Sequence, residues 1–314
     1  MGANPSRWDT PTVKLVGKNS QADKEKMMQT AAVANQSAGT TGTRDIRLLV
    51  LDIDGTIAGE SNQISEPVLR AIQAAQAKGI QVALATGRMY CSALRFHHAI
   101  GSSMPLTCYQ GALIQDPATG GVHRHLPVSH HLAQQLLEHF EEPELRSVLS
   151  VHVYLNDRLY VREITPASKA YGERTGVEPV PVGDLRQFLR AEPTKILALC
   201  DDAAVIDCLL GNMRRRYTPA ELYMTTSVAT FFEATHPAVN KGTAVRYLAE
   251  ELLGLSPANV MAIGDNFNDV EMLAYAGTGV AMGNAPAGVQ AVASWVAPSV
   301  DKDGAAAAIE EFLL

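Results

Sequence analysis

The sequence of 314 residues is poor in cysteine, in aromatic side chains and in positive charge. Its four cysteines show no Cys-x-x-Cys or Cys/His spacing, which argues against a zinc site or a disulfide framework and favours buried thiols in a reducing compartment. Lys and Arg number 26 against 33 Asp and Glu, so the net charge is −7. An acidic balance disfavours binding to nucleic-acid backbones and to anionic lipid. We therefore expect neither nucleic acid nor a membrane as a partner.

The chain also lacks a long hydrophobic run. No segment approaches the roughly 18 apolar residues of a membrane-spanning helix, and the N-terminus lacks the basic and then apolar layout of a secretory signal. We therefore expect a cytoplasmic protein. Residues 1–6 fit the myristoylation pattern M-G-x-x-x-S, but Pro5 and the missing second anchoring signal argue against a lipid anchor. Residues 1–44 are rich in small polar side chains, which predicts a flexible tail.

Short apolar runs that end in polar turns alternate with amphipathic segments in two parts of the chain. Such runs are typical of buried parallel strands, and the segments between them are typical of crossover helices. The pattern predicts an α/β protein with a doubly wound, Rossmann-like parallel sheet as its core. We expect strands at 47–53, 80–85, 105–109, 260–263, 279–282 and 295–297, and helices at 65–79, 89–100, 241–253 and 270–276.

Between these two parts the sequence pattern changes. Short segments in which polar and apolar residues alternate, as is typical of strands, are interleaved with amphipathic helices. We therefore expect an inserted α+β domain at 115–237, and a discontinuous parallel-sheet domain at 45–114 and 238–314. Strands of the inserted domain are expected at 150–155, 158–164, 195–200 and 221–226, and helices at 130–140 and 203–215.

The first predicted strand ends in two carboxylates. Asp52 and Asp54 stand two residues apart and so point to one face, and Gly55 allows a sharp turn after them. Close carboxylates repel each other unless a cation or a proton lies between them, and oxygen ligands of this kind suit Mg²⁺. The alternative, one capping and one solvated aspartate, is less favoured because the pair follows an apolar strand directly.

A second acidic pair follows the strand at 260–263. Asp265 and Asp269 lie four residues apart, and Asn268 adds a neutral amide beside them. Ligands of open α/β sheets bind beyond the carboxyl ends of the strands. Two acidic pairs at such ends predict one cation site of four carboxylates, and two independent helix caps are the weaker interpretation.

Two further clusters suit an anion. Thr86, Gly87 and Arg88 offer a hydroxyl, an open backbone and a guanidinium at the expected start of a helix, and helix N-termini favour phosphate. Lys241 opens a later helix, where a cation opposes the helix dipole and calls for an acidic partner or a bound anion. A plain helix cap at Thr86 and a solvated Lys241 are the alternatives that the residues alone leave open.

The four clusters together provide a metal site, an anion cradle, a counter-charge and a spare carboxylate, which is the set that phosphoryl transfer requires. The chain has no G-x-x-x-x-G-K-[ST], G-x-G-x-x-G or G-x-S-x-G motif, so the signatures of P-loop NTPases, dinucleotide enzymes and serine hydrolases are missing. The nucleophile is then expected to be a carboxylate or water.

In their order, the four motifs resemble those of haloacid dehalogenase-like phosphatases of the Cof-like branch, which carry a large inserted cap (type IIB) after the third core strand. DIDGT at 52–56 resembles the family's D-x-D-G-T, and the Thr86 turn and the runs at 240–242 and 264–269 resemble its other motifs. The stretch at 277–285 resembles a further one of that branch. The family often has Asn-Gly where this chain has Gln110 followed by glycine.

The resemblance implies a mechanism and a set of site residues. It implies Asp52 as the nucleophile that forms an aspartyl-phosphate, and Asp54 as the general acid and then the base. It implies Mg²⁺ as the cofactor, held by Asp52, the backbone carbonyl of Asp54, Asp265 and Asp269. It places Thr86, Gly87, Arg88, Lys241, Asn268 and Asn284 around the phosphoryl group.

The resemblance also implies hydrolysis of small phosphorylated metabolites, sugar phosphates above all. A phosphosugar mutase or phosphotransferase on the same scaffold is the alternative, and a non-catalytic module is disfavoured because every catalytic position is filled. A basic cluster in the cap would favour the mutase, but the arginines at 214–216 are explained more simply by solvation at a helix surface. Candidate specificity residues in the cap, each explained as well by packing, are His152, Tyr154, Arg158, Tyr160 and Thr226.

Overall fold

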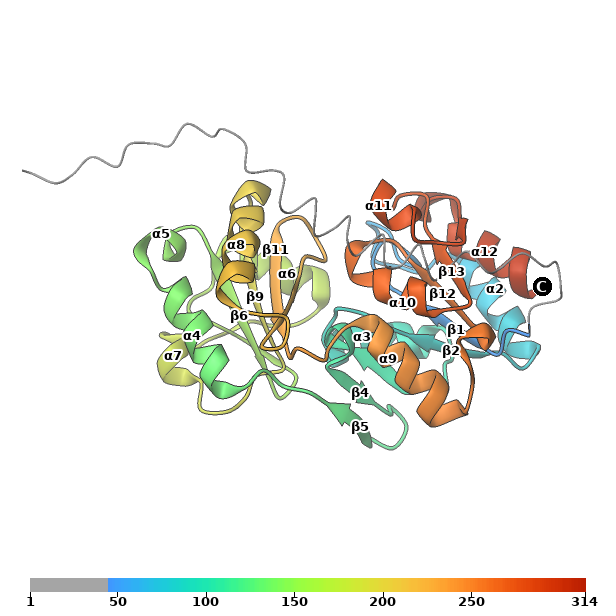
Figure 1. Ribbon diagram of the computed structural model, residues 1–314, viewed down its shortest axis with the longest axis horizontal. Coiled ribbons are helices and arrows are strands. Elements are labelled where there is room, and N and C mark those ends of the chain that lie inside the picture. The colour runs from blue at the N-terminus through green and yellow to red at the C-terminus, as the bar shows by residue number, and fades with distance from the viewer. Residues whose placement is uncertain (1–44) are drawn as a thin grey trace, which may run out of the picture.

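The chain forms two lobes that lie side by side, and it passes from the first lobe into the second and back again (Figure 1). The structure, a computed structural model, describes residues 45–314. The tail predicted at 1–44 and the myristoylation pattern lie outside the described residues. Within the described part of the chain, no helix combines the length and the apolar character needed to cross a membrane.

The core lobe is built on a five-stranded parallel sheet with the order β14-β13-β12-β1-β2. The predicted doubly wound, Rossmann-like sheet is therefore confirmed. In it, β1 lies between β2, which precedes the second lobe in the chain, and β12, which follows that lobe. The strands are β1 (Leu48–Leu51), β2 (Gln81–Leu84), β12 (Val260–Gly264), β13 (Thr278–Ala281) and β14 (Trp295–Val296). A bridge joins β2 to β3 (Leu106–Cys108), which continues into an antiparallel sheet with β4 (Leu113–Gln115) and β5 (Val122–His125).

Helices cover both faces of the parallel sheet because successive strand residues point to opposite sides. Leu49 and Leu51 pack with helices of one face, and Leu48 and Val50 pack with helices of the other. The first face carries α2 (Glu66–Ala77), α3 (Tyr90–Ala99) and α12 (Gly304–Leu313), and the second carries α9 (Lys241–Arg246), α10 (Val270–Tyr275) and α11 (Ala287–Gln290). The helix predicted at 241–253 is α-helical only to Arg246 and then widens into a π-helical turn, Tyr247–Leu252.

The second lobe, called the cap below, is built on a six-stranded sheet with the order β10-β11-β9-β6-β7-β8. Its strands are β6 (Ser150–Leu155), β7 (Arg158–Val161), β8 (Val180–Pro181), β9 (Lys195–Leu199), β10 (Tyr223–Thr225) and β11 (Phe231–Thr235), and its helices are α4 (His130–Phe140), α5 (Pro143–Arg146), α6 (Pro166–Thr175), α7 (Leu185–Phe188) and α8 (Ala203–Arg216). One face of the sheet packs against α4 and α8. Its inner face, which carries Lys195, Leu197 and Glu233, borders the cavity between the lobes.

All four cysteines are free, as expected, but only two of them are buried. Cys108 and Cys200 are buried, whereas Cys91 and Cys208 are exposed, so the prediction of buried thiols is wrong for the latter two. Both exposed cysteines belong to helices, α3 and α8, whose outer sides face solvent. Desolvation and the neighbouring Asp157 raise the pKa of Cys91 to about 12, so this thiol is protonated at neutral pH.

Candidate active site

The predicted polar clusters meet because β1 lies between β12 and β2 in the parallel sheet. Asp52 directly follows β1, Asp265 directly follows β12, and Thr86 comes two residues after β2. All three strands run in one direction, so these residues share the carboxyl edge of the sheet.

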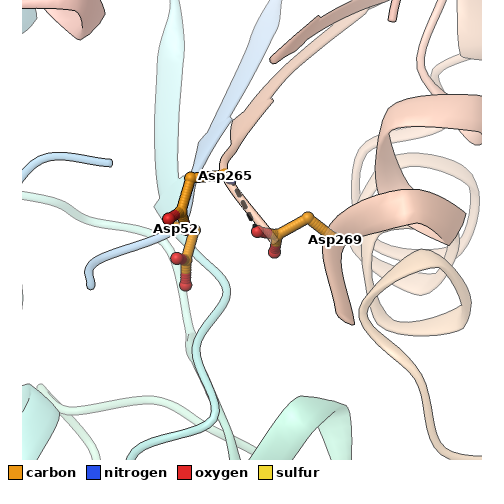
Figure 2. Close-up of side chains that lie close together, drawn as sticks. All are labelled: Asp52, Asp265 and Asp269. Carbon is orange, nitrogen blue, oxygen red and sulfur yellow. Dashed lines mark hydrogen bonds between the residues drawn. The ribbon is translucent and has the colours of Figure 1, made fainter. Parts of the chain in front are cut away.

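Three carboxylates form a cluster at this edge. Asp52, Asp265 and Asp269 each offer an oxygen, and these oxygens lie within 4.8 Å of one another (Figure 2). Asp269 reaches back from the start of α10, and its Oδ2 accepts the backbone N–H groups of Asp265 (2.9 Å) and Asn266 (3.0 Å). Gly55 permits the close approach, because a Cβ there would lie 2.1 Å from Oδ2 of Asp265.

Lys241 supplies the positive charge of the cluster. It opens α9, is fully buried, and its Nζ donates to Oδ1 of Asp52 (2.6 Å) and to Oδ1 of Asp269 (2.5 Å). A cation at a helix N-terminus needs such acidic partners. Although burial disfavours its charge, Asp269 and Asp52 raise the pKa of Lys241, so it stays protonated.

When its groups are all ionised, the cluster carries excess negative charge, since three carboxylates face one ammonium group. Burial raises the pKa of Asp52 to about 7 against the opposing effect of Lys241. Burial and the neighbouring carboxylates raise the pKa of Asp265 to about 8. These carboxylates therefore ionise together with difficulty unless a cation lies among them.

Asp54 lies outside this cluster, so the structure gathers three of the four predicted carboxylates. Arg88 donates from Nε to Oδ2 of Asp54 (2.8 Å) and from Nη2 to Oδ1 (2.7 Å), and Arg174 of the cap donates to Oδ1 (3.3 Å). Burial opposes ionisation of Asp54, but the two arginines lower its pKa overall. The buried Nη1 of Arg88 has no acceptor within residues 45–314.

The turn that contains Thr86 lies at the same carboxyl edge of the parallel sheet. The Oγ1 of Thr86 accepts the N–H of Arg88 (3.1 Å), and Gly87 leaves room for Gln110, whose Nε2 would lie 2.5 Å from a Cβ at that position. Oε1 of Gln110 in turn accepts from Nδ2 of Asn268 (3.0 Å). Thus Gln110, which replaces the expected asparagine, still contacts the site.

Asn284, which the resemblance places around the phosphoryl group, contacts a carboxylate of the cluster in the structure. Its Nδ2 donates to Oδ2 of Asp265 (3.2 Å) and to the carbonyl of Gly55 (2.9 Å). These bonds tie the loop after β1 to the loop after β12. Asn284 therefore contacts a carboxylate of the cluster.

A cavity of about 330 Å³ lies between the two lobes over the cluster. This volume suits a small ligand. Its core side is lined by Asp52, Asp54, Gly87, Arg88, Asp265 and Asn268. Its cap side is lined by polar and aromatic residues that include Arg174, Lys195, Glu233, Tyr171 and Phe231.

The cap candidates named from the sequence, His152, Tyr154, Arg158, Tyr160 and Thr226, do not line this cavity. His152 and Tyr154 are buried in the inner face of the cap sheet beside it. Sequence reasoning missed Lys195 and Glu233, although each carries a signal, a charged residue that begins or interrupts an apolar strand (KILAL and FFEAT).

The cap also contacts the core at the start of α3. Asp157, in the turn between β6 and β7, accepts the backbone N–H groups of Tyr90 (3.0 Å) and Cys91 (2.9 Å) at the start of α3. It also accepts the hydroxyl of Tyr109 (2.7 Å). A cap residue thus supplies the N-terminal cap that α3 itself lacks.

Comparison with known proteins finds matches over nearly all the described chain. A family profile of haloacid dehalogenase-like hydrolases matches residues 49–309. The 5-amino-6-(5-phospho-D-ribitylamino)uracil phosphatase YitU of Bacillus subtilis (strain 168) is 28% identical, over 84% of this chain and 97% of YitU. A phosphoglycolate phosphatase of Methanothermobacter thermautotrophicus is 27% identical, over 85% of this chain and 99% of the relative. The solved structure of BT1666, a HAD-superfamily phosphatase from Bacteroides thetaiotaomicron, is 26% identical with a TM-score of 0.72, over 88% of this chain and 99% of BT1666.

Proposed function

The chain belongs to the haloacid dehalogenase-like hydrolases, in their Cof-like phosphatase branch, and from this membership we propose that it is a Mg²⁺-dependent phosphatase of small phosphate esters. The observation that carries the proposal is the cluster of Asp52, Asp265 and Asp269 around Lys241, beside a cavity between core and cap. We further propose sugar phosphates as the substrate class and 115–237 as the cap that encloses them.

The donor set of the cluster fits a hard divalent cation. All three donors are carboxylate oxygens, and burial, with the neighbouring carboxylates adding to it, raises the pKa of Asp52 and of Asp265, which a bound cation would offset. Asp52, Asp265 and the backbone carbonyl of Asp54 would hold Mg²⁺, with Asp269 beside them. When bound, Mg²⁺ would neutralise charge on the phosphoryl oxygens.

The residues of the chain then divide the reaction into two displacements. An Oδ of Asp52 attacks phosphorus, so the bond from Asp52 to phosphorus forms while the ester bond breaks, and Asp54 gives a proton to the departing alcohol oxygen. Asp54 next takes a proton from water, whose oxygen attacks the aspartyl-phosphate and releases phosphate and free Asp52. Lys241, which donates to Asp52, fixes the nucleophile and balances its charge.

Arg88 and Arg174 decide when Asp54 is able to carry a proton. Both arginines hold the Asp54 carboxylate in its ionised form in this structure. A substrate phosphate beside Arg88, which lines the cavity, competes with Asp54 for the charge of the guanidinium. Its arrival weakens the hold on Asp54 and so permits protonation.

Replacement of the nucleophile tests the proposal. The Asp52→Asn variant should lose at least roughly 10³-fold of Mg²⁺-dependent kcat with p-nitrophenyl phosphate, because an amide does not form the aspartyl-phosphate. A matched control, Asp207→Asn on the exposed side of α8, should keep wild-type turnover and the same circular dichroism. Undiminished turnover in Asp52→Asn would exclude Asp52 as the nucleophile.

A mutase or phosphotransferase remains the second candidate, in which an alcohol hydroxyl replaces water in the second displacement. Release of inorganic phosphate in step with p-nitrophenol favours hydrolysis. Nitrophenol release that exceeds phosphate release, and rises with added sugar, favours transfer.

A further inference from the structure

We propose that the Lys195–Glu233 pair of the cap selects the leaving group, because it binds hydroxyl groups of an uncharged sugar or polyol and disfavours a leaving group with a second anionic group. The inference rests on the proposed phosphatase function and assigns its specificity to two residues.

The pair lies directly beside the loop that is expected to hold the phosphate. Nζ of Lys195 donates to Oε2 of Glu233 (3.0 Å) and to the backbone carbonyl of Gly87 (3.0 Å). Lys195, Glu233 and Gly87 all line the cavity. Whatever is esterified to a phosphate at the Gly87 loop therefore extends past this pair.

Burial makes a purely structural role for the pair costly. The side chains of Lys195 and Glu233 are only 3% and 2% exposed. Taking both charges out of water costs free energy that their attraction offsets only in part, so a buried ion pair is a poor stability device. The pair also lies on the inner face of the cap sheet among apolar neighbours, Leu197, Leu199 and Phe231. Charge placed in such a wall points to recognition of a ligand.

The groups around the pair match the chemistry of a sugar. An ammonium donor next to a carboxylate acceptor is suited to adjacent hydroxyl groups, which both donate and accept. Gln110 and Ser227 donate to Glu233 and hold its carboxylate in place. Tyr171 and Phe231, whose ring centroids are 6.1 Å apart, add an aromatic wall for the C–H face of the ligand.

The charge balance of the cap side disfavours an anionic leaving group. Two cations, Arg174 and Lys195, face two carboxylates, Asp201 and Glu233, so the net charge is zero. Each cation is engaged, Arg174 with Asp54 and Lys195 with Glu233. A second phosphate or carboxylate would therefore meet no spare cation here and would approach Glu233.

Family membership does not make this choice. One relative is named for a phosphoribityl compound and another, at nearly the same identity, for phosphoglycolate, which carries a carboxylate. The cap side of this cavity favours a leaving group that carries no second anionic group.

Three substrates separate recognition of the leaving group from chemistry at phosphorus. We would measure kcat and KM with Mg²⁺ for sorbitol 6-phosphate, 2-phosphoglycolate and p-nitrophenyl phosphate. Wild-type protein should prefer sorbitol 6-phosphate over phosphoglycolate by at least about 10-fold in kcat/KM. Glu233→Gln should shrink that ratio by about 10-fold or more, chiefly through KM for sorbitol 6-phosphate, and should lose less in kcat/KM on the aryl phosphate than on sorbitol 6-phosphate.

Two further variants keep the test decisive. Lys195→Met/Glu233→Gln leaves no unpaired charge and should lose the same preference even where the single variant folds poorly. The exposed pair Lys169–Glu173 on α6 provides the control, since Lys169→Met/Glu173→Gln should keep wild-type values.

A wild-type preference for phosphoglycolate, or an equal loss on all three substrates in Glu233→Gln, would overturn the inference while leaving the phosphatase intact. No Mg²⁺-dependent hydrolysis of any substrate by the wild type would overturn the proposed function, and this inference with it.

Discussion

Lys241 in the core and Lys195 in the cap are both buried and both bound to carboxylates, but the net charge around them differs. Lys241 bonds two carboxylates within a cluster of three, so negative charge is left over. Lys195 bonds the single carboxylate of Glu233 and a backbone carbonyl, so its charge is balanced.

The difference separates two uses of a buried ammonium group. Surplus negative charge around Lys241 creates a demand for a second cation, which suits metal-dependent chemistry. The balanced pair in the cap makes no such demand and offers polar groups to an uncharged ligand. Chemistry at phosphorus is thus expected to depend on the core lysine, and choice of the leaving group on the cap lysine.

The largest expected effect comes from removing each lysine's charge in turn. Lys241→Met leaves Asp52 unoriented, so kcat/KM for p-nitrophenyl phosphate should fall at least roughly 10³-fold. The Lys195→Met/Glu233→Gln variant removes a balanced pair and should reduce the same value by less than about 10-fold. Steady-state kinetics checks both. Similar losses in the two variants would erase the distinction between the lysines.

A smaller effect is expected from the metal on stability. Mg²⁺ at 100 times its Kd should stabilise the wild type by about 2.7 kcal/mol, which raises Tm by roughly 4–5 °C. Asp265→Asn removes a carboxylate of the cluster and should lose most of that shift, whereas the Lys195→Met/Glu233→Gln variant should keep it. Thermal melts in Mg²⁺ and in EDTA give the comparison. An unchanged shift in Asp265→Asn would show that Mg²⁺ binds elsewhere.

The core was more predictable from the sequence than the cap. Polar residues directly after apolar runs identified Asp52 and Asp265, and parallel strands necessarily bring such ends to one edge. The position of the Asp54 carboxylate was not predictable, because Arg88, 34 residues away, and Arg174, 120 residues away, hold it. Local spacing placed Asp54 with Asp52, and a long-range ion pair separates them.

The residues that the cap contributes to the cavity were hard to predict from the sequence for two physical reasons. The helix α6, which carries Arg174, has the sequence PASKAYGERT, in which no apolar stripe of helical period is visible. Glu233 lies within FFEAT, where an acidic residue obscures the pattern of a buried strand. In each case the exceptional residue lines the cavity, so departure from the pattern was itself the signal.

The smallest predicted effect concerns a titratable group of the cap. Burial, and then the charge of Lys195, lower the pKa of His152 to about 3. An unfolded chain takes up this proton near pH 6.5, so acid favours unfolding, and His152 should cost about 2 kcal/mol of stability between pH 7 and pH 5. This dependence is opposite in sign to that of the metal-free core, where the raised pKa values of Asp52 and Asp265 favour the protonated folded state.

Urea unfolding of His152→Phe at pH 7 and at pH 5 measures how much His152 contributes to the pH dependence of stability. The variant should lose about 2 kcal/mol less than the wild type between pH 7 and pH 5, because phenylalanine takes up no proton. His131→Phe, on the exposed side of α4, is the control and should keep the wild-type difference. An identical pH dependence in His152→Phe would mean that His152 gains a proton or a partner when the cap is acidified. The inner face of the cap would then carry a positive charge on His152 in addition to the balanced Lys195–Glu233 pair. Like the core cluster, although with the opposite sign, it would need a counter-ion.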